Sequence, residues 1–446
     1  MTAAIIFVFI VGYILVALES LTRISKTAVA LLMAVICWVL YYMGFGATPE
    51  NISTFTKSLG ETSEILFFLL GAMVIVEVVD TNGGFDFVRE KLYSATKKTL
   101  LWKLTFMTFF LSSVLDNMTT AIVMIMVLNK LISDDRDKLL YSSMVILAAN
   151  SGGAFSPIGD VTTIMLWVKG NISTFGVIRF LLIPSFISIV VPGLIMGRML
   201  KGELVIPEAQ DPVRTTTFDT TSGERWVVFI TGVGGLLFVP IFRLLTDLPP
   251  FMGILMILSL LWIVTEFIFK QKKYKDIPHD RLPDVSALLH KIDISTILFF
   301  LGILTAVSAL AETGSLKRLG DFLDASFDGN PYIVTTIIGF FSAIVDNVPL
   351  VASCMGMYDV ATVQEIADLA SQNVAVYGMD GTFWLLLAYC AGIGGSMLVI
   401  GSAAGVVVMG LQNISFGWYL KHFSWIACLG YLSGILVFWL QELMAI

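Results

Sequence analysis

Long apolar stretches recur throughout this chain of 446 residues and constrain its fold more than any other feature. Stretches of about 17 to 25 residues match the hydrocarbon thickness of a bilayer at the rise of an α-helix. The chain is 57% hydrophobic and 14% charged, which is more apolar surface than a soluble core of this length could bury. A transmembrane barrel would instead show short segments of alternating polarity. The sequence therefore predicts an all-α polytopic membrane protein.

The expected spanning segments follow from hydropathy alone, and their ends are placed where the apolar runs meet polar residues. They are residues 3–18, 27–44, 65–80, 140–168, 175–197, 226–242, 251–269, 294–311, 382–411 and 418–440.

Two further apolar runs each contain one central aspartate, and we interpret both as re-entrant hairpins. They cover residues 101–132, with Asp116 near the middle, and 331–358, with Asp346. If both are hairpins, most of the 27 Lys and Arg residues fall on one side of the membrane. The positive-inside rule makes that side cytoplasmic. Both termini are then non-cytoplasmic, the Asp116 hairpin enters from the cytoplasm, and the Asp346 hairpin enters from outside.

The two halves of the chain resemble each other in three blocks that occur in the same order. The pairs are "ILFFLLGAM" at 65 with "ILFFLGIL" at 297, "SVLDNMT" at 113 with "AIVDNVP" at 343, and "NSGGAFSPIGDVTT" at 150 with "GIGGSMLVIGSAAG" at 392. Chance similarity among apolar residues could explain the phenylalanine blocks, but not the two Asp-Asn pairs and the glycine blocks.

An odd number of crossings in each half gives the halves opposite orientations, as in the inverted repeats of secondary transporters. We therefore expect a first repeat at 1–200, a cytoplasmic linker at 201–225 and a second repeat at 226–446.

The segments 140–168 and 382–411 contain residues that oppose a continuous helix. Pro157 lacks an amide donor, and the neighbouring glycines carry a backbone entropy penalty. Unwound backbone at membrane depth is tolerated only where it is buried in protein or lines a cavity. We therefore expect broken helices in both segments. The second segment has no proline and no acid, so close helix packing through small residues explains it equally well.

Three aspartates, Asp116, Asp160 and Asp346, lie within apolar segments. An aspartate at the centre of a membrane helix costs about 2.5–3.5 kcal/mol on an insertion scale. Around Asp116 the sequence offers Asn117, Thr119 and Thr120 and no nearby His or Cys, so this environment suits a small hard cation. Burial favours the protonated carboxylic acid and a bound cation favours the ionised one. Competition between cation and proton is the minimal chemistry of an antiporter; a helix cap or a buried ion pair is the structural alternative.

These motifs resemble those of a known group of transporters. The form Asp-Asn-x-Thr followed by Asn-x-Gly-Gly-x-x-x-x-Ile-Gly-Asp is similar to the ion transporter superfamily. Within it, "NSGGAFSPIGDVTTIMLW" at 150–167 most resembles the NhaD-type sodium/proton antiporters. The resemblance implies inverted repeats with two re-entrant hairpins, a homodimer, and a transport part that moves against a scaffold.

The resemblance also implies a cation site where the hairpin tips meet the broken helices, with Na+ at Asp116, Asn117, Asn150 and Asp160. The second half departs from the first, because Pro349, Gly392 and Ser402 stand where Thr119, Asn150 and Asp160 do. We therefore expect the cation site in the first half. The full set of expected cation- and proton-binding residues is Asp116, Asn117, Thr119, Asn150, Ser151, Asp160, Thr162, Asp346 and Asn347.

The sequence thus predicts exchange of Na+ or Li+ for H+ by alternating access, with no cofactor, in a multi-pass protein of a bacterial inner membrane. The alternative is a Na+-coupled carrier of a small anion such as citrate, a dicarboxylate or arsenite. An anion site would offer hydroxyls, amides and helix N-termini rather than carboxylates. An intramembrane hydrolase using Ser151 or Ser156 lacks an embedded base. A net charge of −7 without a basic stripe argues against a nucleic-acid partner.

Overall fold

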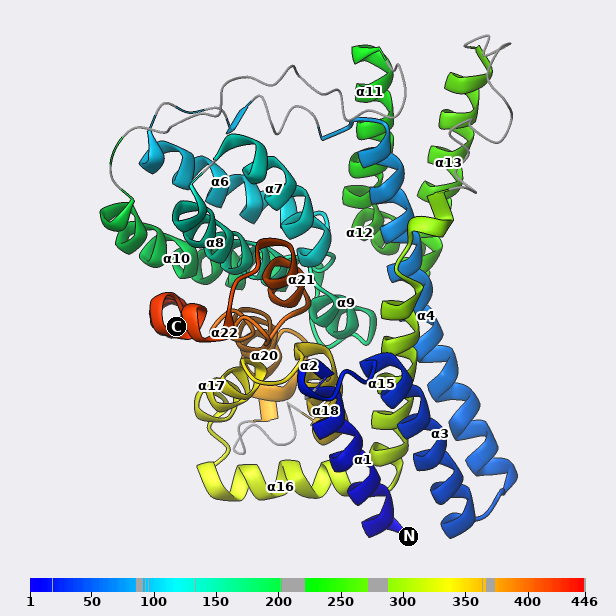
Figure 1. Ribbon diagram of the computed structural model, residues 1–446. Coiled ribbons are helices and arrows are strands. Elements are labelled where there is room, and N and C mark those ends of the chain that lie inside the picture. The colour runs from blue at the N-terminus through cyan, green and yellow to red at the C-terminus, as the bar shows by residue number, and fades with distance from the viewer. Residues whose placement is uncertain are drawn as a thin grey trace.

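Helices make up nearly all of the described part of the chain in the computed structural model (Figure 1). The structure describes residues 1–17, 19–85, 91, 92, 94, 96–132, 134–200, 202, 221–271, 288–362, 364, 365 and 374–444. Within these ranges β pairing is limited to isolated bridges such as that between Ala361 and Gly378. Seven described helices are long and apolar enough to cross a membrane. The predicted all-α polytopic class is confirmed.

One set of helices, which we term the peripheral group, lies on the right of Figure 1. In it α3 packs against α15, and α13 packs against α4, so each half of the chain contributes to both contacts. Its members are α1 (Thr2–Ala17), α3 (Lys26–Phe45), α4 (Pro49–Thr81), α11 (Ser222–Phe229), η1 (Ile230–Gly234), α12 (Gly235–Thr246), α13 (Pro250–Gln271) and α15 (Ile294–Glu312).

The remaining long helices form a central group on the left of Figure 1. Its two largest internal contacts pair α10 with α23 and α17 with α20. The members are α6 (Lys97–Ser112), α7 (Asn117–Leu131), α8 (Asp135–Ala154), α9 (Val161–Val168), α10 (Thr174–Met199), α17 (Pro331–Ser342), α18 (Asn347–Met357), α20 (Thr382–Gly394), α21 (Ala403–Gln412), α22 (Phe416–His422) and α23 (Ser424–Met444). Shorter elements are α2 (Glu19–Thr22), η3 (Leu289–Lys291), α16 (Ser315–Phe327) and η5 (Val374–Tyr377).

The centre of the molecule lies where α8 packs against α20. Every residue of α8 from Tyr141 to Ala154 is buried, and so is every residue of α20 from Phe383 to Gly394. A helix that is apolar or small on all sides belongs inside a protein. These two helices therefore carry their C-terminal ends into the middle of the fold.

Each apolar run with a central aspartate is split into two helices by a four-residue turn. Residues 113–116 separate α6 from α7, and residues 343–346 separate α17 from α18. The serine that ends the first helix donates to the broken helix beside it in both cases. Ser112 Oγ lies 2.7 Å from the carbonyl oxygen of Ala149, and Ser342 Oγ lies 2.6 Å from that of Ala391.

Both segments predicted to be broken helices are interrupted as expected. Residues 155–160 separate α8 from α9, and residues 395–402 separate α20 from α21. Glycine is required where each interruption meets the neighbouring turn. A Cβ atom at Gly159 would lie 2.4 Å from the carbonyl oxygen of Ser112, and one at Gly401 would lie 2.5 Å from that of Ala343. The backbones can approach this closely only because no side chain intervenes.

One spanning segment is much longer than the sequence predicted. Helix α4 begins at Pro49, whereas the expected segment begins at residue 65. Thr48 caps the helix by accepting from the backbone amide of Asn51, and Pro49 occupies the first turn, where its missing donor costs nothing. Residues 50–64 are polar because part of this stretch lines a cavity described below. Most of the predicted linker at 201–225 lies outside the described residues.

Candidate functional site

Two asparagine side chains, one from each half of the chain, meet at a buried carboxylate, that of Asp160. The side-chain amide of Asn117 donates to Asp160 Oδ2 at 2.9 Å and to Asn150 Oδ1 at 3.0 Å. From the second half of the chain, Asn347 Nδ2 approaches the same Oδ2 atom at 3.4 Å. All four residues are buried, and Asp160 is 1% exposed. A polar cluster so completely buried requires partners for each member.

Asn150 extends this cluster across the molecule to the other broken helix. Its side-chain nitrogen lies 2.8 Å from Ser396 Oγ and 2.9 Å from Ser402 Oγ. Because its oxygen accepts from Asn117 while its nitrogen donates to two hydroxyls, the orientation of the amide is fixed by the network. The two broken helices are therefore joined through one asparagine.

Four helix N-termini converge on this cluster. Asp160 and Ser402 are the N-cap residues of α9 and α21, and Asn117 and Asn347 are the first residues of α7 and α18. Such N-termini carry partial positive charge, which the Asp160 carboxylate offsets. The backbone amide of Thr162 also donates to Asp160 Oδ1 at 3.1 Å.

The donor set of the cluster suits a small hard cation. It offers one carboxylate, three carboxamides and two hydroxyls, all of them oxygen-bearing ligands that alkali and alkaline-earth ions accept. A rotation of about 180° about the terminal torsion of an asparagine exchanges its nitrogen and oxygen. Asn117 and Asn347, which donate to Asp160 here, can by that rotation present oxygen to a cation.

Asp116 does not point into this cluster but turns back onto its own helix. As the N-cap of α7 it accepts from the backbone amide of Thr119 at 2.9 Å, and it also accepts from the Thr119 hydroxyl. It borders a cavity of about 50 Å³ between the turn and α4 and α15. Among the described residues that line this cavity, Asp116 is the one charged side chain.

Asp346 occupies the matching position in the second half, but its environment differs. It caps α18 by accepting from the backbone amide of Val348 at 3.2 Å. In addition, Lys26 Nζ at the start of α3 lies 3.7 Å from Asp346 Oδ2. Both Asp116 and Asp346 are close enough to Asp160 to interact with it electrostatically.

Besides Asp116, Thr119 and Asp346, the predicted residue Ser151 also lies away from the cluster, and three residues at or near the site were not predicted. Ser151 Oγ faces Ser188 Oγ of α10 at 2.8 Å. Ser396, Ser402 and Lys26 were not among the expected site residues. The repeat could have identified Ser402, since it aligns with Asp160. The sequence carries no signal that pairs Lys26 with Asp346.

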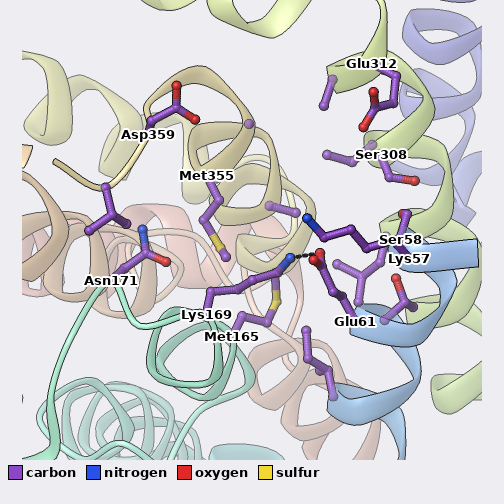
Figure 2. A pocket seen from close by; sticks show the side chains of 18 of the residues that line it. Lys57, Ser58, Glu61, Met165, Lys169, Asn171, Ser308, Glu312, Met355 and Asp359 are labelled. Atoms are coloured by element: carbon purple, nitrogen blue, oxygen red, sulfur yellow. Dashed lines mark hydrogen bonds and ion pairs between the residues drawn. The ribbon is translucent and has the colours of Figure 1, made fainter. Parts of the chain in front are cut away.

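A cavity of about 500 Å³ opens beside the cluster, between α4, α9, α15 and α18. Figure 2 shows the side chains of Lys169 and Glu61 pointing toward each other across it, joined as an ion pair. Lys57, Glu312 and Asp359 also face the space. Its apolar floor includes Ile65, Met165, Leu304 and Ala352. We call this cavity the vestibule, and five charged side chains line it: Lys57, Glu61, Lys169, Glu312 and Asp359.

Comparison with known proteins assigns the chain to a family. Residues 13–376 match the citrate transporter family. Sodium/proton antiporter 2 of Arabidopsis thaliana is 43% identical over 435 residues, which cover 96% of this chain and 97% of that protein. The Na(+)/H(+) antiporter NhaD of Vibrio cholerae is 28% identical over 467 residues, covering 97% of this chain and 90% of that protein.

A solved structure has the same general fold. The YdaH transporter of Alcanivorax borkumensis, whose structure is described as having an unusual topology, covers 88% of this chain with a TM-score of 0.54 and 12% identity. The alignment covers 89% of that chain. The length of the family match and the identity to relatives covered almost end to end place this chain in the citrate transporter family, in the branch of the sodium/proton antiporters.

Proposed function

We propose that this protein exchanges Na+, and also Li+, for H+ across a membrane. The observation that carries the proposal is the buried carboxylate of Asp160, held by amides from both predicted hairpin tips. Proteins named sodium/proton antiporters share up to 43% of its residues across nearly the whole chain, which supports the same conclusion.

The exchange rests on competition for the same oxygen atoms. Asp160, Asn117 and Asn150 hold the cation, and Asp116, which precedes Asn117 and caps α7, provides a second carboxylate. A dehydrated Na+ ion favours ionised carboxylates, whereas burial in an apolar surrounding favours the protonated acid. A high Na+ concentration on one side therefore displaces protons, and a high proton concentration on the other side displaces Na+.

The alternating-access architecture that we propose is an inverted repeat with two re-entrant hairpins. The matched serine bonds at Ser112 and Ser342 support it, as do the matched close approaches at Gly159 and Gly401. The vestibule supplies access from one side. We assign that side to the exterior, in line with the distribution of Lys and Arg, and place the protein as a homodimer in the inner membrane of a bacterium.

A second function, Na+-coupled transport of a small anion, has one observation in its favour. Four helix N-termini converge near the cluster, and such ends bind anionic groups. The family match is also named for a citrate carrier. The Asp160 carboxylate already occupies the meeting point of these helix ends, however, and a second anion there would be repelled by it.

The proposal is tested with purified protein in liposomes that carry a pH gradient. External Na+ should dissipate the gradient in wild type, and Asp160→Asn should reduce the rate to that of protein-free liposomes. Asp135→Asn provides a matched control, because the Asp135 side chain is 94% exposed. Uptake of labelled citrate or succinate with Na+, without a change in the pH gradient, would replace exchange with anion transport.

A further inference from the structure

The two hairpin aspartates differ in whether the protein itself supplies a counter-charge. Lys26 Nζ lies 3.7 Å from Asp346 Oδ2. Among the described residues no ion pair forms at Asp116, whose carboxylate accepts from the amide and the hydroxyl of Thr119. The aligned aspartates of the two halves thus differ: Asp346 has a lysine as its counter-charge, and Asp116 has no counter-charge among the described residues.

The position of Lys26 is set by several contacts besides the ion pair. Its backbone amide donates to Glu19 Oε1 at 2.9 Å, which fixes the start of α3. Its ammonium group also lies 4.7 Å from the centre of the Phe299 ring on α15, where the face of an aromatic ring attracts a cation. The Lys26 side chain is 28% exposed and that of Asp346 16% exposed. The ammonium is therefore held in a partly desolvated place and is not a freely solvated loop charge.

We propose that the ammonium group of Lys26 serves as a built-in cation for Asp346. It occupies the place that a transported ion would take in the second half of the protein. This inference rests on the proposed exchange of Na+ and H+ and defines which carboxylates take part in it. Asp116 and Asp160, which have no basic partner among the described residues, carry the exchanged ions. Asp346 binds no transported cation.

The rest of the second half is consistent with this assignment. Gly392 stands where the first half has Asn150, and a Cβ atom there would lie 3.7 Å from Asp160 Oδ2. The cap of α21 is the hydroxyl of Ser402, which is uncharged and already accepts a hydrogen bond from the side-chain amide of Asn150. Asp346 thus accepts from the backbone amide of Val348 and lies beside Lys26. Asp160 accepts from the side-chain amides of Asn117 and Asn347 and has no lysine partner among the described residues.

The test counts Na+ ions bound at saturation by purified protein, using radioactive Na+ at alkaline pH. Replacing Lys26 with methionine keeps an unbranched side chain of similar length and removes its charge, leaving Asp346 without its partner. We expect Lys26→Met to bind one more Na+ per chain than wild type. Lys26→Arg should bind the wild-type number, and Lys26→Met combined with Asp346→Asn should return to it.

Equal Na+ binding by Lys26→Met and wild type would overturn the assignment. So would a loss of Na+-driven exchange in the folded Lys26→Met/Asp346→Asn variant, because Asp346 would then be needed for transport. The wild-type count tests the proposed function separately. If wild type binds no Na+ and does not exchange it, antiport fails, while a gain of one ion in Lys26→Met would still support the role of Lys26.

Discussion

The side-chain amide of Asn117 links Asp160 to Asn150, with distances of 2.9 Å to Asp160 Oδ2 and 3.0 Å to Asn150 Oδ1. Asn150 belongs to α8 and Asp160 caps α9, so one residue at the start of α7 bridges the interruption between them. The predicted hairpin tip is thereby bonded to both arms of the broken helix. Any ion that enters must replace or rearrange these two bonds.

Asn117→Ala should weaken Na+ binding more than Asn347→Ala does. Asn117 makes two short bonds, whereas Asn347 makes one contact of 3.4 Å with Asp160. A hydrogen bond to a charged group is worth about 1.5–3 kcal/mol, so Asn117→Ala should raise the half-saturating Na+ concentration about 10-fold or more. The measurement is the Na+ dependence of exchange in liposomes. A larger effect of Asn347→Ala would show that the second half of the chain contributes more to the site than the first.

Gly159→Ala should destabilise the protein, because its methyl group would lie 2.4 Å from the carbonyl oxygen of Ser112. Overpacking of this kind costs about 1–3 kcal/mol, and it should lower the apparent Tm of the purified protein. Gly392→Ala is the matched control. Its methyl group would lie 3.4 Å from Ala154 Cβ and 3.7 Å from Asp160 Oδ2, so it should preserve the Tm while slowing exchange. Equal Tm values for wild type and Gly159→Ala would contradict the close packing.

Much of the fold could be predicted from hydropathy and from residues that break helices. Pro157 and its neighbouring glycines predicted the first interruption, and the similarity of the halves suggested a second within 382–411, which the structure has at residues 395–402. The start of α4 could not be predicted, because residues 50–64 are polar and their helical state depends on a cap at Thr48 and on the vestibule. Hydropathy measures contact with lipid and does not detect a helix that faces water inside a membrane protein.

The site was less predictable than the fold, because side-chain direction depends on tertiary contacts. The sequence grouped Asp116 and Asp160 as equals, but the cap with Thr119 turns Asp116 away from the cluster. Likewise Ser151 and Asn150 are adjacent, and helical geometry sends their side chains to different neighbours. Lys26 and Asp346 are far apart in sequence, and only the packing of α15 with α3 and α18 brings them together.

Thr119→Val should impair exchange, whereas Thr119→Ser should preserve it. Both the backbone amide and the hydroxyl of Thr119 bond to the Asp116 carboxylate. Valine keeps the shape and loses the hydroxyl that stabilises the ionised form. Since a bond to a charged group is worth about 1.5–3 kcal/mol, half-maximal exchange should require about 10-fold more Na+. If Thr119→Val has the Na+ dependence of wild type, Asp116 takes no part in the exchange reaction.

Cysteine labelling should distinguish the vestibule from the small cavity at Asp116 along a single helix. Ser58 and Ala72 both belong to α4, and they line the vestibule and the small cavity respectively. In a variant without Cys37, Cys354, Cys390 and Cys428, an impermeant thiol reagent added to whole cells should label Ser58→Cys and leave Ala72→Cys unlabelled. Labelling of Ser58→Cys only in inverted membranes would place the vestibule on the cytoplasmic side. Because a cavity with an apolar lining excludes a charged reagent, rapid labelling of both cysteines from outside would mean that the vestibule and the small cavity are connected.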